Sequence, residues 1–289
     1  MSKFIISSDT TCDLTSEFCK ENNIDIHPLF YHFNDSIIYG KDQNLEPSDF
    51  YSRMRNGELP TTMATNPEDS KELFKKRLDE GYDIIHIAFS SALSSSCQNA
   101  ALAANELSET YKDRKITVID SLGASLGEGL LVYKAVNYAN AGHSYEETVQ
   151  YINDTILHIS HQFTVDDLFH LHRGGRVSKA SAIIGTLVSI KPLLHVDNEG
   201  RLTAVGKTRG RKKSLTALVD KMAATMGTRD NETIMISHGD SYEEAEYVKE
   251  LILSRFSNVK NVIINYVCPT IGAHSGPGTI ALFFEADER

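Results

Sequence analysis

The fold is decided by the segment DIIHIAF at residues 83–89, which is followed directly by SSALSSSCQNA at residues 90–100. The first segment is a short apolar run rich in β-branched residues, which is typical of a strand buried in a parallel sheet. The second segment predicts a loop and the start of a helix, because Ser is a favoured residue at helix N-termini. Repeated strand–loop–helix units of this kind build a mainly parallel sheet covered by helices.

The same alternation continues on both sides of this unit. Residues 4–6, 24–33 and 115–120 are further apolar runs that predict strands. Asn66 followed by Pro67 marks a helix start, and Ser144 with Glu147 forms a capping-box pattern. We therefore predict an N-terminal α/β domain over residues 1–160, with a mainly parallel sheet and flanking helices.

The second half of the chain has a more mixed pattern. Residues 190–196 and 201–205 predict two strands joined by a hairpin turn, DNEG at 197–200. A helix over 211–226, a strand over 233–237, a helix opening at 241 and strands over 259–267 and 279–284 follow. We predict a C-terminal mixed α/β domain over residues 161–289, with the boundary between residues 158 and 163.

Composition places the chain among globular proteins. The chain has 289 residues, of which 41% are hydrophobic and 24% charged, and this length suits two domains. No apolar run reaches the ~18 residues of a membrane span, and the apolar N-terminal stretch is too short for a signal peptide. The four cysteines form no C-x-x-C pair and fit reduced thiols. We expect a cytoplasmic protein with at most transient membrane contact.

Charge is unevenly distributed along the chain. The net charge is −10, which argues against nucleic-acid binding. Residues 173–213 nevertheless contain ten Lys and Arg against two Asp and Glu, a local charge of +8, so the remainder carries −18. Such a basic segment fits an anionic ligand, an acidic partner surface or simply a solvated face.

Four segments are candidates for binding an anion. Ser94 and Ser96 lie at a predicted helix start, where free backbone N–H groups attract carboxylates, although Ser is also a plain cap. Thr62 lies in a predicted loop at 59–67, which could close over a ligand or only cap the next helix. His274 lies among three glycines at 272–278, either a site of close ligand approach or a tight turn. Arg173 opens a basic stretch that begins RGGR.

Several other segments do not match the nucleotide-binding, metal-binding or hydrolase patterns that they partly resemble. Gly206-Lys207-Thr208 ends like a P-loop, but the preceding residues look like a strand. The pairs His158 with His161 and His170 with His172 match no zinc pattern, so no metal site is expected. No G-x-S-x-G motif or Ser-His-Asp arrangement is recognisable.

Six segments, taken in order, resemble the DegV family of bacterial proteins. They are ISSDTTCDL at 6–14, SALSSSCQNA at 91–100, ASLGEG at 124–129, RGGRVSKA at 173–180, IKPLL at 190–194 and GAHSGPG at 272–278. The resemblance covers nearly the whole chain. It implies a two-domain α/β fold with a buried long-chain fatty acid.

The resemblance also assigns roles to individual residues. It implies that Thr62, Ser94 and His274 hold the fatty-acid carboxylate, and that Arg173 and Ser96 lie near the head group or a phosphate. It further implies a separate ATP-binding kinase subunit, which phosphorylates the bound carboxylate and so feeds phospholipid synthesis. Arg209 and Arg211 then lie in the segment expected to dock that subunit. No cofactor other than the bound fatty acid is expected.

The chain departs from the usual family pattern at two places. Residues 62–65 read TMAT where TSQP is usual, and residues 95–97 read SSC where GTY is usual. Thr62 and Ser94 are retained, so anion binding is still expected, while acyl chain length, saturation preference and oligomeric state stay open. The rival hypothesis is a stand-alone α/β phosphotransferase or hydrolase that uses His274 and Ser94 on a small anionic substrate. The absence of a nucleotide-binding motif favours a carrier that is not an enzyme by itself.

Overall fold

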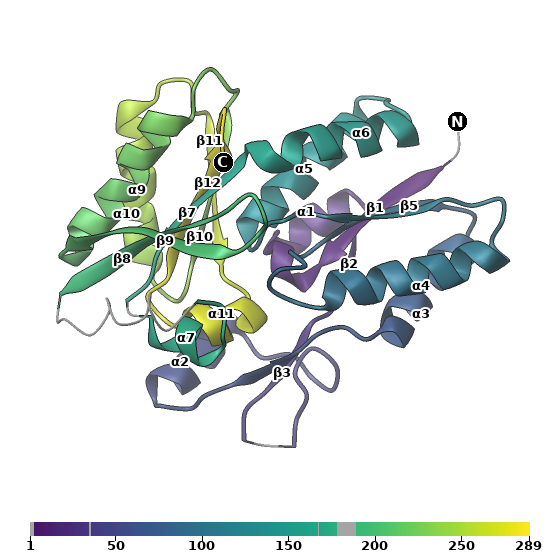
Figure 1. The fold of residues 1–289 in the computed structure, drawn as a ribbon, viewed down its shortest axis with the longest axis horizontal. Coiled ribbons are helices and arrows are strands. Elements are labelled where there is room, and N and C mark those ends of the chain that lie inside the picture. The colour runs from purple at the N-terminus through teal and green to yellow at the C-terminus, as the bar shows by residue number, and fades with distance from the viewer. Residues whose placement is uncertain (1–2, 35, 167, 178–188) are drawn as a thin grey trace.

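The computed structural model describes residues 3–34, 36–166, 168–177 and 189–289. Two sheets lie side by side, and a small third layer with α2, α7, α11 and β3 lies below them (Figure 1). Among the described residues, no helix combines the length and the apolar character that crossing a membrane requires. The predicted fold class, a parallel sheet and a mixed sheet each flanked by helices, is confirmed.

The first sheet is parallel throughout, as the sequence predicts. Its strand order is β2-β1-β5-β6, with β1 at Phe4–Asp9, β2 at Asp25–His27, β5 at Asp83–Ala88 and β6 at Ile116–Asp120. Every residue of β5 is buried, because helices cover both faces. Alternate residues along the strands therefore enter two separate cores.

The helices of the first half divide between these two faces. Phe74 and Leu78 of α3 and Ala100 of α4 share one core cluster with Ile5 and Ile84. The opposite face packs against α5 and α6. The helices span Ser16–Glu21 for α1, Pro67–Asp79 for α3, Ser96–Thr110 for α4, Leu126–Asn140 for α5 and Tyr145–Thr155 for α6.

The two predicted helix starts are confirmed. The Asn66 side chain accepts a hydrogen bond from the backbone N–H of Asp69, with Pro67 as the first helical residue of α3. Ser144 and Glu147 form the reciprocal capping box of α6. These bonds satisfy backbone donors that a helix N-terminus otherwise leaves free.

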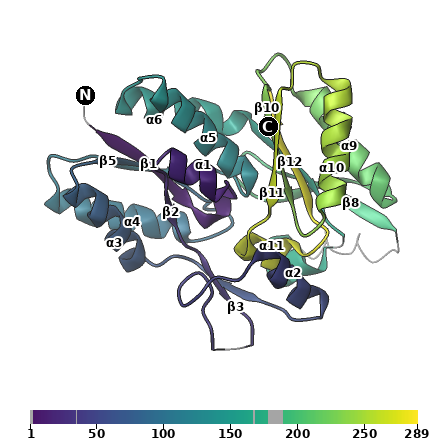
Figure 2. The same ribbon diagram turned by 180° about the vertical axis from the view of Figure 1, so that it is seen from behind.

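The second sheet is mixed, with strand order β11-β10-β12-β7-β8-β9. Only β10 and β11 run parallel, and the remaining pairs are antiparallel. Helices α9 and α10 cover its outer face, as Figure 2 shows from behind. The elements span Ile159–Thr164 for β7, Ile190–Val196 for β8, Leu202–Arg209 for β9, Arg211–Thr225 for α9, Thr233–His238 for β10, Tyr242–Arg255 for α10, Asn261–Tyr266 for β11 and Ile280–Glu285 for β12.

Helix α5 joins the two halves into one body. Its buried Leu126, Leu130 and Leu131 share a core cluster with Ile85 of the first sheet and Phe283 of the second. The second sheet begins with β7 at Ile159, close to the predicted boundary, but residues of both sheets enter this shared core. The division into residues 1–160 and 161–289 therefore stays a prediction.

Two local predictions are wrong. Residues 24–33 form two strands instead of one, since β2 ends before Pro28 and β3 (Phe30–His32) pairs with β4 in another sheet. Proline supplies no backbone N–H and constrains the residue before it, which explains the break. The predicted loop at 59–67 contains strand β4 (Thr61–Met63). The glycine-rich segment at 272–278 contributes to helix α11 (Pro269–Ser275), which packs beside α2 (Pro47–Arg55) and α7 (Phe169–Arg173).

Part of the basic segment lies outside the described residues. Residues 178–188 include the end of the RGGRVSKA motif and the start of the stretch before β8. The described part of that segment forms the end of α7, the β8–β9 hairpin and the start of α9.

Candidate functional site

A cavity of about 240 Å³ lies where the carboxyl-end loops of the first sheet meet the second sheet. Open α/β sheets bind ligands at this edge, outside the carboxyl ends of their strands. The wall is mostly apolar. Its larger apolar side chains are Leu29, Met63, Phe89, Leu93, Phe163, Leu171, Leu202, Ile271 and Phe283.

Three of the predicted anion-binding residues line this cavity. They are Thr62 from β4, Ser94 from the loop before α4 and His274 from the last turn of α11. Thr62 and His274 are 212 positions apart in the chain, yet the Thr62 hydroxyl oxygen lies 2.8 Å from Nε2 of His274. The fold thus collects a hydroxyl and an imidazole from distant segments at one place.

His274 is positioned by a close approach to Gly174. A Cβ atom at Gly174 would overlap Nδ1 of His274, so the glycine leaves room for the ring. Nδ1 is buried and has no hydrogen-bond partner among the described residues. Burial, together with the charges of Arg176 and Arg173, lowers the pKa of His274 to about 4. The imidazole is therefore neutral near pH 7 and acts as a hydrogen-bonding group.

Ser94 lies two residues before the start of α4. Its hydroxyl oxygen accepts a hydrogen bond from the backbone N–H of Ser96 at 3.2 Å and lies 2.7 Å from the Ser96 hydroxyl. Ser95 also lines the cavity, whereas Ser96 is buried behind Ser94 and does not. The partial positive charge of the 15-residue helix adds to the attraction for an anion.

The two arginines of the RGGR motif differ in position. Arg176 lines the cavity and donates to the carbonyl oxygen of Leu93, at 2.8 Å from Nη2 and 3.2 Å from Nε. Arg173 does not line it. Its Nη2 donates to the carbonyl oxygens of Pro60 and Ala273, at 2.9 and 3.0 Å, and so ties the start of β4 to α11. The sequence singled out the motif, but only the structure distinguishes a cavity-lining arginine from a bridging one.

A second polar wall was not predicted from the sequence. Thr11 and Ser125 line the cavity and turn their hydroxyl groups away to buried carboxylates. Thr11 donates to Glu128 at 2.9 Å, and Ser125 donates to Asp13. No Asp or Glu lines the cavity in the part of the chain that the structure describes. Arg176 is therefore the charged group at the described surface of the cavity, which suits an anionic ligand.

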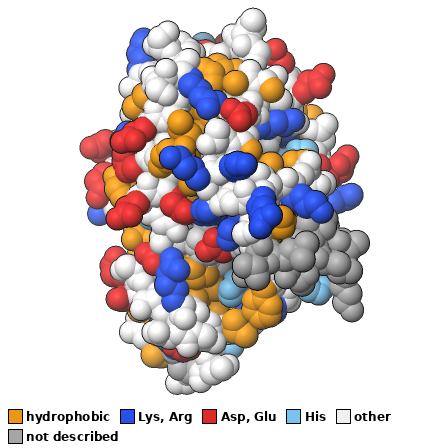
Figure 3. All heavy atoms as spheres, turned by 90° about the vertical axis from the view of Figure 1, so that its left-hand side faces the viewer, with side chains coloured by type: hydrophobic (Ala, Val, Ile, Leu, Met, Phe, Trp, Pro, Cys, Tyr) orange, Lys and Arg blue, Asp and Glu red, His pale blue; other side chains and the backbone are white. Residues whose placement is uncertain are grey.

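The two residues predicted to dock a partner differ in exposure. Arg209 is exposed at the end of β9. Arg211 is turned inward, with its guanidinium bonded to Glu244 and 3.9 Å from a carboxylate oxygen of Asp166. Figure 3 shows Lys and Arg side chains gathered across the middle of one face of the molecule. Of the two predicted docking residues, Arg209 is the one available at the surface.

Comparison with known proteins places this geometry in a family. Residues 3–287 match a family described as uncharacterised proteins of the DegV family. A DegV domain-containing protein of Clostridium perfringens is 38% identical over 290 residues, covering 100% of this chain and 99% of that protein. The chain belongs to the DegV family.

Solved structures of DegV proteins have the same fold. The chain resembles a DegV family protein from Thermus thermophilus, described by its fatty-acid binding, with a TM-score of 0.88, 27% identity and coverage of 98% and 99% of the two chains. It also resembles DegV of Bacillus subtilis, described as a fatty acid binding protein, with a TM-score of 0.83, 27% identity and coverage of 99% and 100%. The similarity of fold therefore extends over both sheets.

Proposed function

We propose that the chain binds a long-chain fatty acid, with the hydrocarbon tail in the cavity and the carboxylate at Thr62, Ser94 and His274. The observation that carries this proposal is the cavity itself, which has a mostly apolar wall and also exposes the hydroxyl, imidazole and guanidinium groups of Thr62, Ser94, His274 and Arg176. DegV proteins of the same fold from Thermus thermophilus and Bacillus subtilis are described as fatty-acid binding. We call Thr62, Ser94, Arg176 and His274 the head-group cluster.

The tail supplies most of the affinity in this proposal. Burying about 14 methylene groups at ~0.8 kcal/mol each stabilises the complex by ~11 kcal/mol before the entropy of immobilising the ligand is subtracted. The carboxylate sets the orientation, because each hydrogen bond to a charged group contributes only about 1.5–3 kcal/mol. Arg176 and the N-terminus of α4 place positive charge beside the carboxylate.

We further propose that the chain presents this carboxylate to a separate ATP-binding kinase subunit, and that it is not an enzyme by itself. The hydroxyl of Ser94 is engaged with Ser96, and His274 is engaged with Thr62, so neither forms a nucleophile–base pair with the other. The basic surface that includes Arg209, Lys207 and Lys212 offers a docking face for an acidic partner. The lack of a Ser94–His274 pair counts against a stand-alone phosphotransferase or hydrolase that uses these two residues.

The first test is extraction of the purified protein with organic solvent after denaturation, followed by mass spectrometry. The expected result is about one fatty acid per chain. Delipidated protein should rebind a long-chain fatty acid, and Thr62→Ala or Ser94→Ala should weaken binding about tenfold or more. Thr61→Ala is the matched control, since Thr61 is the exposed neighbour on the same strand.

Two results would contradict the proposal. A protein that stays empty when offered fatty acids of several lengths does not use the cavity for this ligand. Acyl-phosphate formed from ATP by the purified chain alone would show that no separate kinase subunit is required. The second result leaves fatty-acid binding intact, so the two parts of the proposal are tested separately.

A further inference from the structure

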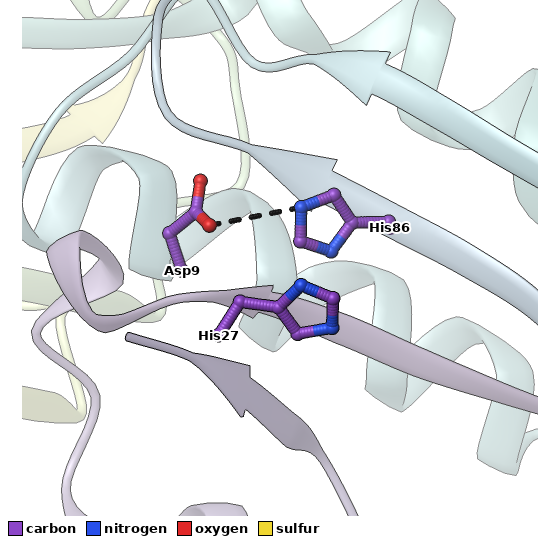
Figure 4. A group of neighbouring side chains, drawn as sticks. All are labelled: Asp9, His27 and His86. Carbon is purple, nitrogen blue, oxygen red and sulfur yellow. Dashed lines mark ion pairs between the residues drawn. The ribbon is translucent and has the colours of Figure 1, made fainter. Parts of the chain in front are cut away.

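Two histidines and an aspartate converge on one face of the first sheet, outside the cavity. They are Asp9 at the end of β1, His27 at the end of β2 and His86 in β5, and Figure 4 shows the three side chains facing one another. Each side chain offers one oxygen or nitrogen atom, and these three atoms all lie within 4.8 Å of one another. All three residues are buried, with exposed fractions of 2%, 1% and 0%.

Strand register explains why these residues meet. Asp9 is the partner of His27 across β1 and β2, and Ser7 is the partner of His86 across β1 and β5. Partners in adjacent parallel strands point to the same face, as do residues two positions apart in one strand. All four side chains therefore point to the face that α3 covers, where the Phe74 ring lies 4.8 Å from the His27 ring and 5.3 Å from the His86 ring.

The atoms that face one another lack hydrogen bonds. Nδ1 of His27 and Nε2 of His86 have no hydrogen-bond partner among the described residues, although both are buried. Nε2 of His86 lies 3.7 Å from Oδ1 of Asp9, which is too long for a hydrogen bond. Leaving buried polar atoms unpaired is unfavourable, so this arrangement requires an explanation.

The outer atoms of the same side chains are held in place. Nδ1 of His86 lies 3.0 Å from the Ser7 hydroxyl, and Oδ2 of Asp9 accepts a hydrogen bond from the backbone N–H of Phe89 at 2.9 Å. Metal-ligating histidines and carboxylates are oriented in this way by partners on their outer atoms. The inner lone pairs of His86 and Asp9 are thus aimed at the space between the three residues.

We infer that Asp9, His27 and His86 form a binding site for a divalent first-row transition metal ion such as Zn²⁺. Two imidazoles and one carboxylate are a ligand set that zinc and iron sites use, with further positions left for water. Bonds of 2.0–2.1 Å place two ligands of a tetrahedral ion ~3.3 Å apart, close to the 3.7 Å between Asp9 and His86. A small inward movement of the side chains would complete the site.

Such an ion would tie three neighbouring strands together near the cavity. Asp9 bonds to the backbone of Phe89, and Phe89 lines the cavity at the start of the loop that carries Ser94. Metal binding would therefore stabilise the strand ends from which this loop departs. The inference does not depend on which ligand the cavity binds.

The test is metal analysis of the full chain, stripped with a chelator and reloaded with Zn²⁺ alone. We expect one equivalent of Zn²⁺ per chain and a rise of several degrees in Tm, because a ligand that binds only the folded state stabilises it. Co²⁺ in place of Zn²⁺ should give visible d–d bands of a four-coordinate nitrogen and oxygen site. His27→Asn and His86→Asn should each weaken metal binding about 100-fold or more, whereas His143→Asn, at a partly exposed histidine outside the cluster, should not.

Two outcomes would overturn the inference. The first is a folded wild-type chain that takes up no stoichiometric Zn²⁺ or Co²⁺, which would leave a metal-free Asp–His pair. The second is uptake that both His27→Asn and His86→Asn retain, which would place the metal elsewhere. The Co²⁺ spectrum of the wild-type chain identifies the ligand type even where a variant fails to fold.

Discussion

The head-group cluster and the part of the same cavity wall formed by Thr11 and Ser125 have opposite electrostatics. At the head-group cluster, Arg176 and the neighbouring Arg173 supply positive charge. Behind Thr11 and Ser125 lie Asp13 and Glu128, which we call, together with Asp9, the buried acid cluster. Basic side chains thus lie at the first region, and acidic side chains lie behind the second.

Burial shifts the pKa values of the two regions in opposite directions. It lowers the pKa of His274 to about 4, so the histidine stays neutral. It raises the pKa of Asp13 to about 7 and that of Glu128 well above its ordinary value. Both regions thus reduce their own buried charge, and the charge of Arg176 remains at the cavity. We therefore expect an anionic ligand to place its charged end at the head-group cluster and its apolar part along the rest of the cavity.

The largest effect is expected when Asp13→Asn changes the buried acid cluster, and it concerns the pH dependence of the unfolding free energy. The raised pKa of Asp13, caused first by burial, means that the folded state holds this proton more tightly than the unfolded state. Its contribution to stability is therefore present below about pH 4 and is lost as the pH rises to about 7. Relative to Asp13→Asn, the wild-type chain should lose roughly 3 kcal/mol of unfolding free energy between about pH 5 and about pH 8.

Urea denaturation at several pH values measures this difference. Asn suits the position sterically and conformationally, since Asp13 has a left-handed backbone with φ of 53°. Asp113→Asn, at an exposed aspartate, is the control and should run parallel to the wild-type chain at every pH. A wild-type stability that rises relative to Asp13→Asn over this range would show that Asp13 is ionised in the folded protein.

The next effect tests how the head-group cluster is held. Gly174→Ala introduces a Cβ into the space of the His274 ring, although the backbone of Gly174, with φ of −76° and ψ of −6°, is one that Ala adopts. The unfolding free energy should fall by about 1–3 kcal/mol through overpacking, and fatty-acid affinity should fall with it. Calorimetric titration of delipidated protein measures the second effect.

The neighbouring glycine supplies the control. Gly175 has φ of +72°, but a Cβ at this position would meet no atom within 4 Å, so Gly175→Ala strains the backbone without reaching His274. It should lower stability by about 1 kcal/mol and leave affinity unchanged. In the background of His274→Ala, the substitution Gly174→Ala should have little further effect on affinity. If Gly174→Ala lowered the affinity equally in the wild-type chain and in His274→Ala, its effect would not act through His274.

A smaller effect on ligand affinity is expected to distinguish the cavity-lining Arg176 from the bridging Arg173. Arg176→Gln removes the charge at the cavity, and we expect fatty-acid affinity to fall about tenfold. Arg173→Gln removes the bridge between Pro60 and Ala273, and we expect lower stability with a smaller change in affinity. Binding titrations and urea denaturation of both variants decide the question. A larger affinity loss in Arg173→Gln would return the head-group role to Arg173, as the sequence resemblance implies.

Local sequence patterns predicted most of the fold. The strand–loop–helix unit at residues 83–100 gave β5 and α4, and the caps at Asn66 and Ser144 gave the starts of α3 and α6. These signals depend on neighbouring residues, so they are readable without a structure. In the second half, the paired strands β8 and β9 were also predicted, because the turn at residues 197–200 separates two apolar runs.

The parts that could not be predicted depend on long-range register. Thr62, Ser94 and His274 were candidates from their motifs, and they line one cavity because β4, α4 and α11 meet there. Asp9, His27 and His86 belong to three strands, and only the pairing of β2, β1 and β5 brings them together. No spacing in the sequence records that pairing.

The smallest expected effect concerns a contact between the first sheet and the β8–β9 hairpin. Ser90, two residues after the end of β5, donates a buried hydrogen bond of 2.9 Å to the carbonyl oxygen of Gly200 in the β8–β9 turn. Gly200 has φ of +78°, and a Cβ there would overlap the Ser90 hydroxyl, so the turn approaches the first sheet closely. Ser90→Ala should lower the unfolding free energy by about 1 kcal/mol, with Ser91→Ala as the neighbouring control.

The same substitution should also act on the ligand. The hairpin carries Val196 and Leu202, which line the cavity, so a looser hairpin should speed the release of a bound fatty acid more than it slows its binding. Stopped-flow displacement of a fluorescent fatty acid measures the release rate. If Ser90→Ala lowered stability but left release unchanged, the hairpin would be a fixed wall, and ligand exchange would have to pass through the head-group cluster instead.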